Sequence, residues 1–90
     1  MAILVVFDAP EMTTAQYDQV INDLEAAGLG NPDGRIFHAA AAQGEGMFVS
    51  DVWESEEQFN RFGEALIPII VATGATPAEP TIYRIHNTLS

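Results

Sequence analysis

The sequence predicts an α+β protein with a ferredoxin-like fold, in which the elements follow the order βαββαβ. Three observations lead to this prediction: a short, uniformly apolar segment near the N-terminus, two amphipathic segments that each start at a capping residue, and a hairpin between them. In this order, two crossovers and one hairpin give a four-stranded antiparallel sheet with two helices on one face. The expected strand order is 4-1-3-2, which places the first strand in the middle of the sheet.

The first strand is expected over residues 2–7, where every side chain is apolar, as in a strand covered on both faces. A helix follows from Thr13, because Thr13 and Gln16 have the spacing of a capping box, and Gly28 suits the position after the last turn. Its apolar stripe consists of Tyr17, Val20, Ile21 and Leu24. Residues 30–34 have turn chemistry and lead into the hairpin.

The hairpin is expected as strands over residues 35–42 and 47–54, joined by Gly44 and Glu45. Gly supplies the positive φ that a tight two-residue turn needs. With this turn, residues that face each other across the hairpin have numbers that add to 89.

This register gives the sequence its best candidate site. It places His38 opposite Asp51, and Ile36 opposite Trp53. Because side chains alternate along a strand, His38, Asp51 and Trp53 share one face of the sheet.

The second helix is expected to begin after Ser55, with Gln58 as its capping-box partner, and to end at Gly74. Pro68 removes one internal hydrogen bond and should bend or interrupt it. Its buried stripe consists of Phe59, Phe62, Leu66, Ile69 and Ile70. The last strand is expected over residues 81–88.

Composition bounds the function. The chain has 90 residues, and residues 1–90 are expected to form one domain. Its net charge is -10, so neither nucleic acid nor an anionic membrane is an expected partner. There is no cysteine, which excludes disulfides and thiolate metal sites. The apolar run of residues 2–7 is too short for a signal-peptide core or a membrane span, so a cytoplasmic protein is expected.

The sheet is expected to need a second cover. Two helices can cover only one face of a four-stranded sheet, yet Leu4 and Val6 point one way while Ile3, Val5 and Phe7 point the other. One apolar set would face water in a monomer, and monomers rarely expose an apolar patch of that size. A homodimer with the two sheets face to face is therefore expected; the alternative is a sheet face that stays partly hydrated.

The segment DVWESEEQFNRF (residues 51–62), which ends a strand and opens a helix, resembles the dimeric α+β barrel superfamily. It is most similar to the small antibiotic biosynthesis monooxygenase-like proteins, and the similarity extends over the whole chain in length and element order. The resemblance implies a face-to-face sheet dimer and a pocket between sheet and helices that is lined by Trp53. Members of that family include cofactor-free oxygenases, haem-degrading enzymes, isomerases and many proteins without known activity.

The sequence departs from two better-defined types within this family. The haem-degrading type carries a His on the second helix, where this chain has Phe62 and Gly63. The oxygenase type carries an Asn late in or just after the first strand, where this chain has Phe7 and Asp8. Neither pattern is matched, and no cofactor is expected.

His38 and Asp51 are the candidate catalytic pair. The carboxylate would orient the imidazole and stabilise its cation, leaving the other ring nitrogen as general acid or base. The alternative is an ordinary cross-strand contact worth a few tenths of a kcal/mol. Trp53 is expected either as a pocket wall for a planar ligand or as core, and these two roles are compatible.

Further ligand-binding candidates are Tyr17 on the first helix, Phe59 and Phe62 on the second, and His86 in the last strand. His86 and His38 are expected too far apart to share a metal ion, and no metal site is predicted. The first hypothesis is a cofactor-independent enzyme, monooxygenase-like or a proton-transfer isomerase or cyclase, acting on a small apolar or aromatic molecule. The second is a non-catalytic module that binds a small hydrophobic ligand or only dimerises.

Overall fold

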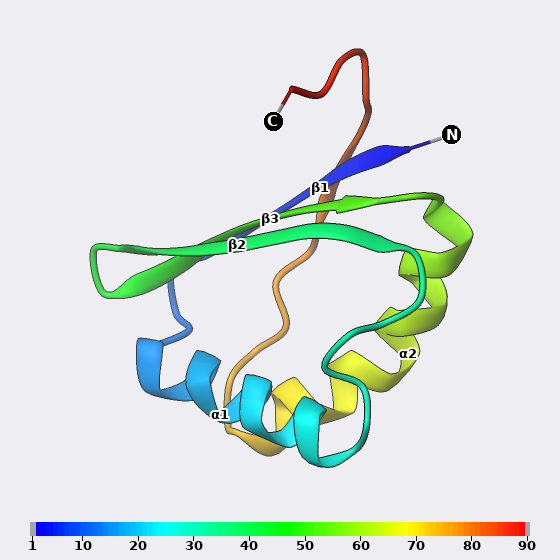
Figure 1. The fold of residues 1–90 in the computed structure, drawn as a ribbon. Coiled ribbons are helices and arrows are strands. Elements are labelled where there is room, and N and C mark those ends of the chain that lie inside the picture. The colour runs from blue at the N-terminus through cyan, green and yellow to red at the C-terminus, as the bar shows by residue number, and fades with distance from the viewer. Residues whose placement is uncertain (1, 90) are drawn as a thin grey trace.

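The computed structural model describes residues 2–89, so the two ends of the predicted domain, residues 1 and 90, lie outside the described part. Its elements are β1 (Ile3–Ala9), α1 (Thr14–Ala26), β2 (Arg35–Gln43), β3 (Gly46–Trp53), α2 (Glu56–Ala72) and β4 (Thr81–Arg84). The four strands form one antiparallel sheet in the order β2-β3-β1-β4. Both helices lie on one side of that sheet, as Figure 1 shows. The predicted ferredoxin-like fold and strand order are confirmed.

Local sequence signals set the helix ends. The Thr13 hydroxyl accepts from the Gln16 backbone N–H at 3.1 Å, and the Gln16 side chain accepts from the Thr13 N–H at 3.0 Å, which completes the predicted capping box. Ser55 caps α2 by accepting from the Gln58 N–H at 3.2 Å. Gly28, with φ of +77°, takes the left-handed position after α1.

Pro68 and the end of the last strand depart in part from the sequence-based expectation. Pro68 does not interrupt α2, which runs from Glu56 to Ala72. Pro68 is exposed, so the carbonyl that loses its intrahelical donor can be hydrated. The last strand stops at Arg84 rather than at residue 88, because β4 pairs only with β1, which begins at Ile3 opposite Arg84.

The hairpin has the predicted two-residue turn, since Gln43 pairs with Gly46 and Gly44 has φ of +60°. His38 faces Asp51 as expected. β2 begins at Arg35 as predicted, but the predicted pairing of Ile36 with Trp53 is wrong.

A β-bulge changes the register there. Arg35, not Ile36, faces Trp53, and Phe37 already faces Val52, so Ile36 is an extra residue on β2.

The two faces of the sheet have different surroundings. The inner face, which we define as the face toward the helices, carries Ile3, Val5 and Trp53, with Val5 and Trp53 fully buried. Helix side chains complete this core: Val20, Leu24, Phe59 and Phe62. The outer face is the opposite one, and no helix of residues 2–89 covers it (Figure 1).

The outer face is largely apolar. Strand pairing places on it Leu4, Val6, Phe37, Phe48, Val52 and Tyr83. Phe37 is 55% exposed and Tyr83 is 54% exposed, so this surface is open in the single chain. Within residues 2–89, no helix is long and apolar enough to cross a bilayer.

Candidate functional site

Three polar side chains from three different elements meet on the inner face of the sheet: Tyr17 of α1, His38 of β2 and Asp51 of β3. The His38 Nδ1 lies 2.5 Å from the Asp51 Oδ1, and the Tyr17 hydroxyl oxygen lies 2.6 Å from the His38 Nε2. The Tyr17 and His38 rings are parallel within 2°. The three side chains therefore form one continuous hydrogen-bonded chain.

Backbone structure explains why they meet. The hairpin register places His38 and Asp51 directly opposite each other on one face. Tyr17 lies one turn after the cap of α1, and its backbone N–H donates to the Thr13 carbonyl at 3.0 Å. The capping box thus fixes the start of the helix that carries Tyr17 toward the hairpin.

Asp51 is held from both sides. It is only 4% exposed, and its second oxygen, Oδ2, accepts from the Trp53 indole N–H at 3.3 Å. Trp53 is two residues along the same strand, so its side chain lies on the same face. A buried carboxylate is costly unless its oxygens are hydrogen-bonded, and here both oxygens have a partner.

The proton positions in this chain follow from its partners. With Asp51 as a carboxylate, the Nδ1–H of His38 donates to it, and the Nε2 of a neutral ring is then an acceptor for the Tyr17 O–H. Burial, and secondly the charge of Asp51, raise the pKa of Tyr17, while Arg35 acts in the opposite direction. The Tyr17 phenol is therefore protonated at neutral pH and acts as a donor.

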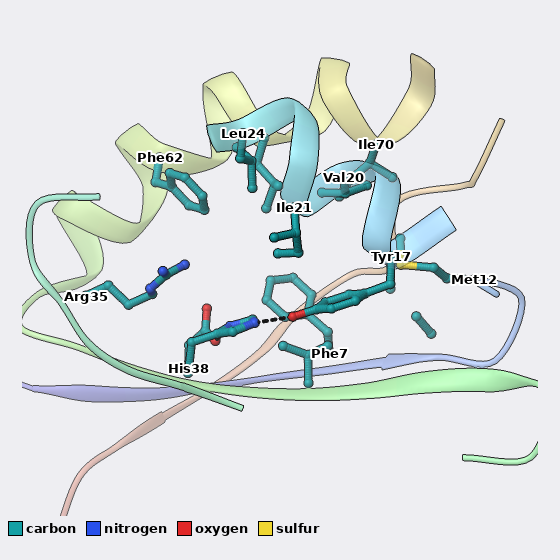
Figure 2. Close-up of a pocket in the computed structure, with 15 residues that line it drawn as sticks. Phe7, Met12, Tyr17, Val20, Ile21, Leu24, Arg35, His38, Phe62 and Ile70 are labelled. Atoms are coloured by element: carbon teal, nitrogen blue, oxygen red, sulfur yellow. Dashed lines mark hydrogen bonds and ion pairs between the residues drawn. The ribbon is translucent and has the colours of Figure 1, made fainter. Parts of the chain in front are cut away.

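A pocket opens beside this hydrogen-bonded chain, between the sheet and the two helices. Figure 2 shows the Tyr17 hydroxyl pointing to His38, with apolar helix side chains above both rings. The cavity itself has a volume of about 80 Å³, and the empty space including its open mouth is about 640 Å³. The apolar lining is Phe7, Ala9, Met12, Val20, Ile21, Leu24, Val49, Phe62, Leu66, Ile70 and Ala78. Four polar or charged residues join it: Tyr17, Arg35, His38 and Asp51.

The structure brings together some of the predicted site residues and separates others. Tyr17, His38, Asp51 and Phe62 line the pocket.

Trp53 and Phe59 lie behind the pocket in the core instead. Trp53 has no exposed surface and packs edge-on against Phe59, with ring centroids 5.7 Å apart. Its indole reaches the site only through Asp51. His86 follows β4, is exposed and does not line the pocket.

Sequence reasoning missed Arg35, whose side chain lines the pocket. A regular hairpin would have turned this residue to the outer face, and nothing in the local sequence marks a bulge at Ile36. Within residues 2–89, no group of three or more His, Cys, Asp or Glu side chains is arranged to hold a metal ion.

Solved structures with this arrangement of elements are known. SnoaB from Streptomyces nogalater, a cofactor-independent oxygenase, superposes with a TM-score of 0.63 at 18% identity, over 98% of this chain and 94% of SnoaB. A protein from Deinococcus radiodurans, proposed to be an antibiotic biosynthesis monooxygenase, gives 0.62 at 12% identity over 100% and 97%. The chain has the fold of the antibiotic biosynthesis monooxygenase-like proteins.

That fold is shared by proteins with different activities. The heme-degrading protein Rv3592 from Mycobacterium tuberculosis also superposes, with a TM-score of 0.57 and 18% identity over 100% of both chains. No protein-family model and no curated protein sequence matches this chain. Identities this low show the fold, and function must be argued from the site.

Proposed function

We propose that the protein is a cofactor-independent enzyme that moves a proton on a small, largely apolar or aromatic molecule bound between sheet and helices. The observation that carries this proposal is His38, which is held between Asp51 and Tyr17 at the wall of an apolar pocket. An acid–base group beside a carboxylate that stabilises its cation is the arrangement that general-base catalysis needs.

The order of the hydrogen bonds supports one path for the proton. The neutral His38 ring has a single lone pair on Nε2, and the Tyr17 hydroxyl uses it. A substrate proton therefore moves to the Tyr17 oxygen while the Tyr17 proton moves to Nε2. The imidazolium that results is stabilised by Asp51, and the reverse movement returns the proton to another atom of the substrate.

Two reaction types fit this path. An isomerase or cyclase needs only the removal and return of a proton. An oxygenase needs dioxygen as co-substrate after the proton is removed; the activity named for SnoaB supports this form.

The non-catalytic alternative also has an observation in its favour. Every polar atom of the Tyr17–His38–Asp51 chain is satisfied within the protein, so these bonds could serve only to attach α1 to the sheet. In that case the pocket would bind a hydrophobic molecule without changing it.

We also propose that a second copy of the chain covers the outer face, sheet against sheet. The open apolar side chains of that face, with Phe37 and Tyr83 more than half exposed, support this arrangement. The dimer leaves the pocket on the inner face accessible, since the helices and the partner lie on opposite sides of the sheet.

The test is hydrogen–deuterium exchange at carbon in apolar bicyclic ketones. Protein in D₂O is incubated with 1-tetralone or 1-indanone, and deuterium at the acidic C–H is measured by mass spectrometry, with an oxygen electrode reporting any uptake of dioxygen. Because general acid–base groups contribute about 10²- to 10⁴-fold, His38→Gln should lower the exchange rate by at least about 10²-fold. Thermal unfolding of the variant controls for folding. Equal exchange by the wild type and His38→Gln would remove His38 from the mechanism.

A further inference from the structure

Arg35 is the cation of the pocket. Of the chain's three arginines, Arg61 lies on the surface of α2 in an ion pair with Glu57, and Arg84 belongs to β4. Among the described residues that line the pocket, Arg35 is the only arginine or lysine. Figure 2 shows the Arg35 side chain extending into the pocket, below the labelled Phe62 and above the labelled His38 in this view.

The bulge at Ile36 brings Arg35 there. Without it, Arg35 would alternate with Ile36 and Phe37 and would be on the outer face. With Ile36 as an extra residue, Arg35 faces Trp53, whose side chain is on the inner face. Ile36 is 60% exposed, as expected for a residue that the bulge turns outward. Bulges beside active sites commonly redirect a side chain in this way.

The Arg35 guanidinium has more N–H donors than the one that its hydrogen bond within the protein uses. One of its five N–H groups donates to the Gly30 carbonyl at 2.9 Å. Within residues 2–89, no carboxylate lies within ion-pair distance of Arg35, although the chain has thirteen acidic residues. Asp51, the one acidic residue among the described residues that line the pocket, is already bonded to His38 and Trp53.

A cation without a carboxylate partner beside an apolar cavity favours an anion in that cavity. Charges interact more strongly there than in water, because the apolar walls lower the effective dielectric constant. Arg35 also acts at the Tyr17 hydroxyl, whose pKa it lowers against the larger effects of burial and of Asp51. The guanidinium is therefore in electrostatic reach of the end of the pocket where the Tyr17–His38–Asp51 chain lies.

We propose that Arg35 makes this pocket selective for apolar acids, molecules with an aromatic or aliphatic body and one ionised oxygen group, such as a carboxylate, that pairs with the guanidinium. This inference deepens the proposed function by naming its ligand class, and it rests on that function only in treating the ligand as a substrate. The planar guanidinium suits a carboxylate because two parallel N–H groups can bind its two oxygens.

The test compares acids with neutral molecules of the same shape by isothermal titration calorimetry. The pairs are 2-naphthoate with 2-naphthamide and octanoate with octanamide. A hydrogen bond to a charged group is worth enough for at least about a tenfold preference for the acid in the wild type. Arg35→Gln should remove the preference, because it removes the charge and the paired N–H groups while keeping a polar side chain. Arg35→Lys, which keeps the charge, should retain part of it.

Arg61→Gln is the matched control, because it makes the same change in net charge on the exposed face of α2. It should leave the preference for the acid unchanged. The inference is overturned if the wild type shows no preference for the acid in either pair, including the case where none of the four molecules binds. It is also overturned if Arg35→Gln keeps the preference. Since no turnover is measured, these outcomes are independent of the exchange rates that test His38.

Discussion

Asp51 offers the sharpest test of the hydrogen-bonded chain, because its two oxygens accept from two different donors. Asp51→Ala removes the acceptor for the His38 Nδ1–H and leaves the indole N–H of the fully buried Trp53 without a partner. A buried donor without a partner costs about 1 to 3 kcal/mol, and breaking a buried pair costs about 3 to 5 kcal/mol in all. A domain of this size is stable by only about 5 to 13 kcal/mol, so the loss should be large.

Asp51→Asn should behave differently, because the amide offers one acceptor and one donor. Its oxygen can accept from Trp53 while its NH₂ donates to His38 Nδ1, which requires the ring to carry its hydrogen on Nε2 and donate it to Tyr17. The fold then loses only the difference between charge-assisted and neutral bonds, about 1 to 2 kcal/mol. The proposed proton relay, from the substrate through Tyr17 to His38, is then lost, because Nε2 no longer accepts the Tyr17 proton. The rate of deuterium exchange into the ketone should fall by about 10²- to 10⁴-fold.

Three measurements check this pair of variants: urea unfolding for stability, ¹⁵N NMR of the imidazole nitrogens for the tautomer, and ketone exchange for activity. The expected pattern is a small stability loss with inactivity for Asp51→Asn and a large stability loss for Asp51→Ala. If Asp51→Ala costs less than about 1 kcal/mol, the value of an ordinary hydrogen bond, the carboxylate does not support the site as described. The relay would be refuted if the Asp51→Asn variant stayed active while its His38 ring still carried the hydrogen on Nδ1.

Two further predictions concern pH and assembly. The raised pKa of Tyr17 means that the native state keeps the phenolic proton at pH values where the unfolded chain has lost it. The contribution of this difference to the free energy of unfolding is therefore fully present below the ordinary pKa of 10.0 and falls as pH rises through the folded value. Tyr17→Phe should flatten this alkaline fall in denaturant unfolding at pH 9 to 11; an unchanged slope would contradict it. Val52→Arg, a charge in the middle of the outer face, should reduce the sedimenting mass from twice to once the 9.7 kDa of one chain, whereas Val71→Arg on exposed α2 should not. A wild type that sediments at 9.7 kDa would refute the dimer.

The sequence predicted the elements that depend on local chemistry. Thr13 and Ser55 mark the helix starts because a cap acts within three residues, and the Gly44–Glu45 turn sets the register that brings His38 opposite Asp51. The errors occurred where distant partners decide. The last strand ends at Arg84 because its partner strand β1 begins at Ile3, and one further backbone bond, from the Ile85 N–H to the Ala2 carbonyl, follows the paired residues.

The site was predicted only in part for the same reason. The pairing of His38 with Asp51 follows from the turn, but the role of Trp53 depends on how the helices pack, and they bury it completely. Arg35 was missed because the bulge at Ile36 involves no Gly and leaves no mark in the local sequence. The face to which a residue points beyond a bulge depends on the packing contacts of its side chain in the folded protein.

The hydrogen bond from Tyr17 to His38 holds α1 against the sheet and is also the step through which the proposed proton transfer would pass. It links α1 to β2, and the pocket lies between that helix and the sheet. A ligand that forced α1 away from the sheet would break the relay, whereas one that fits under the helix leaves the Tyr17 oxygen in place to receive its proton. On the proposed mechanism we therefore expect a flat ligand to be preferred to a bulky one of equal hydrophobicity, since it would leave the Tyr17–His38–Asp51 chain intact.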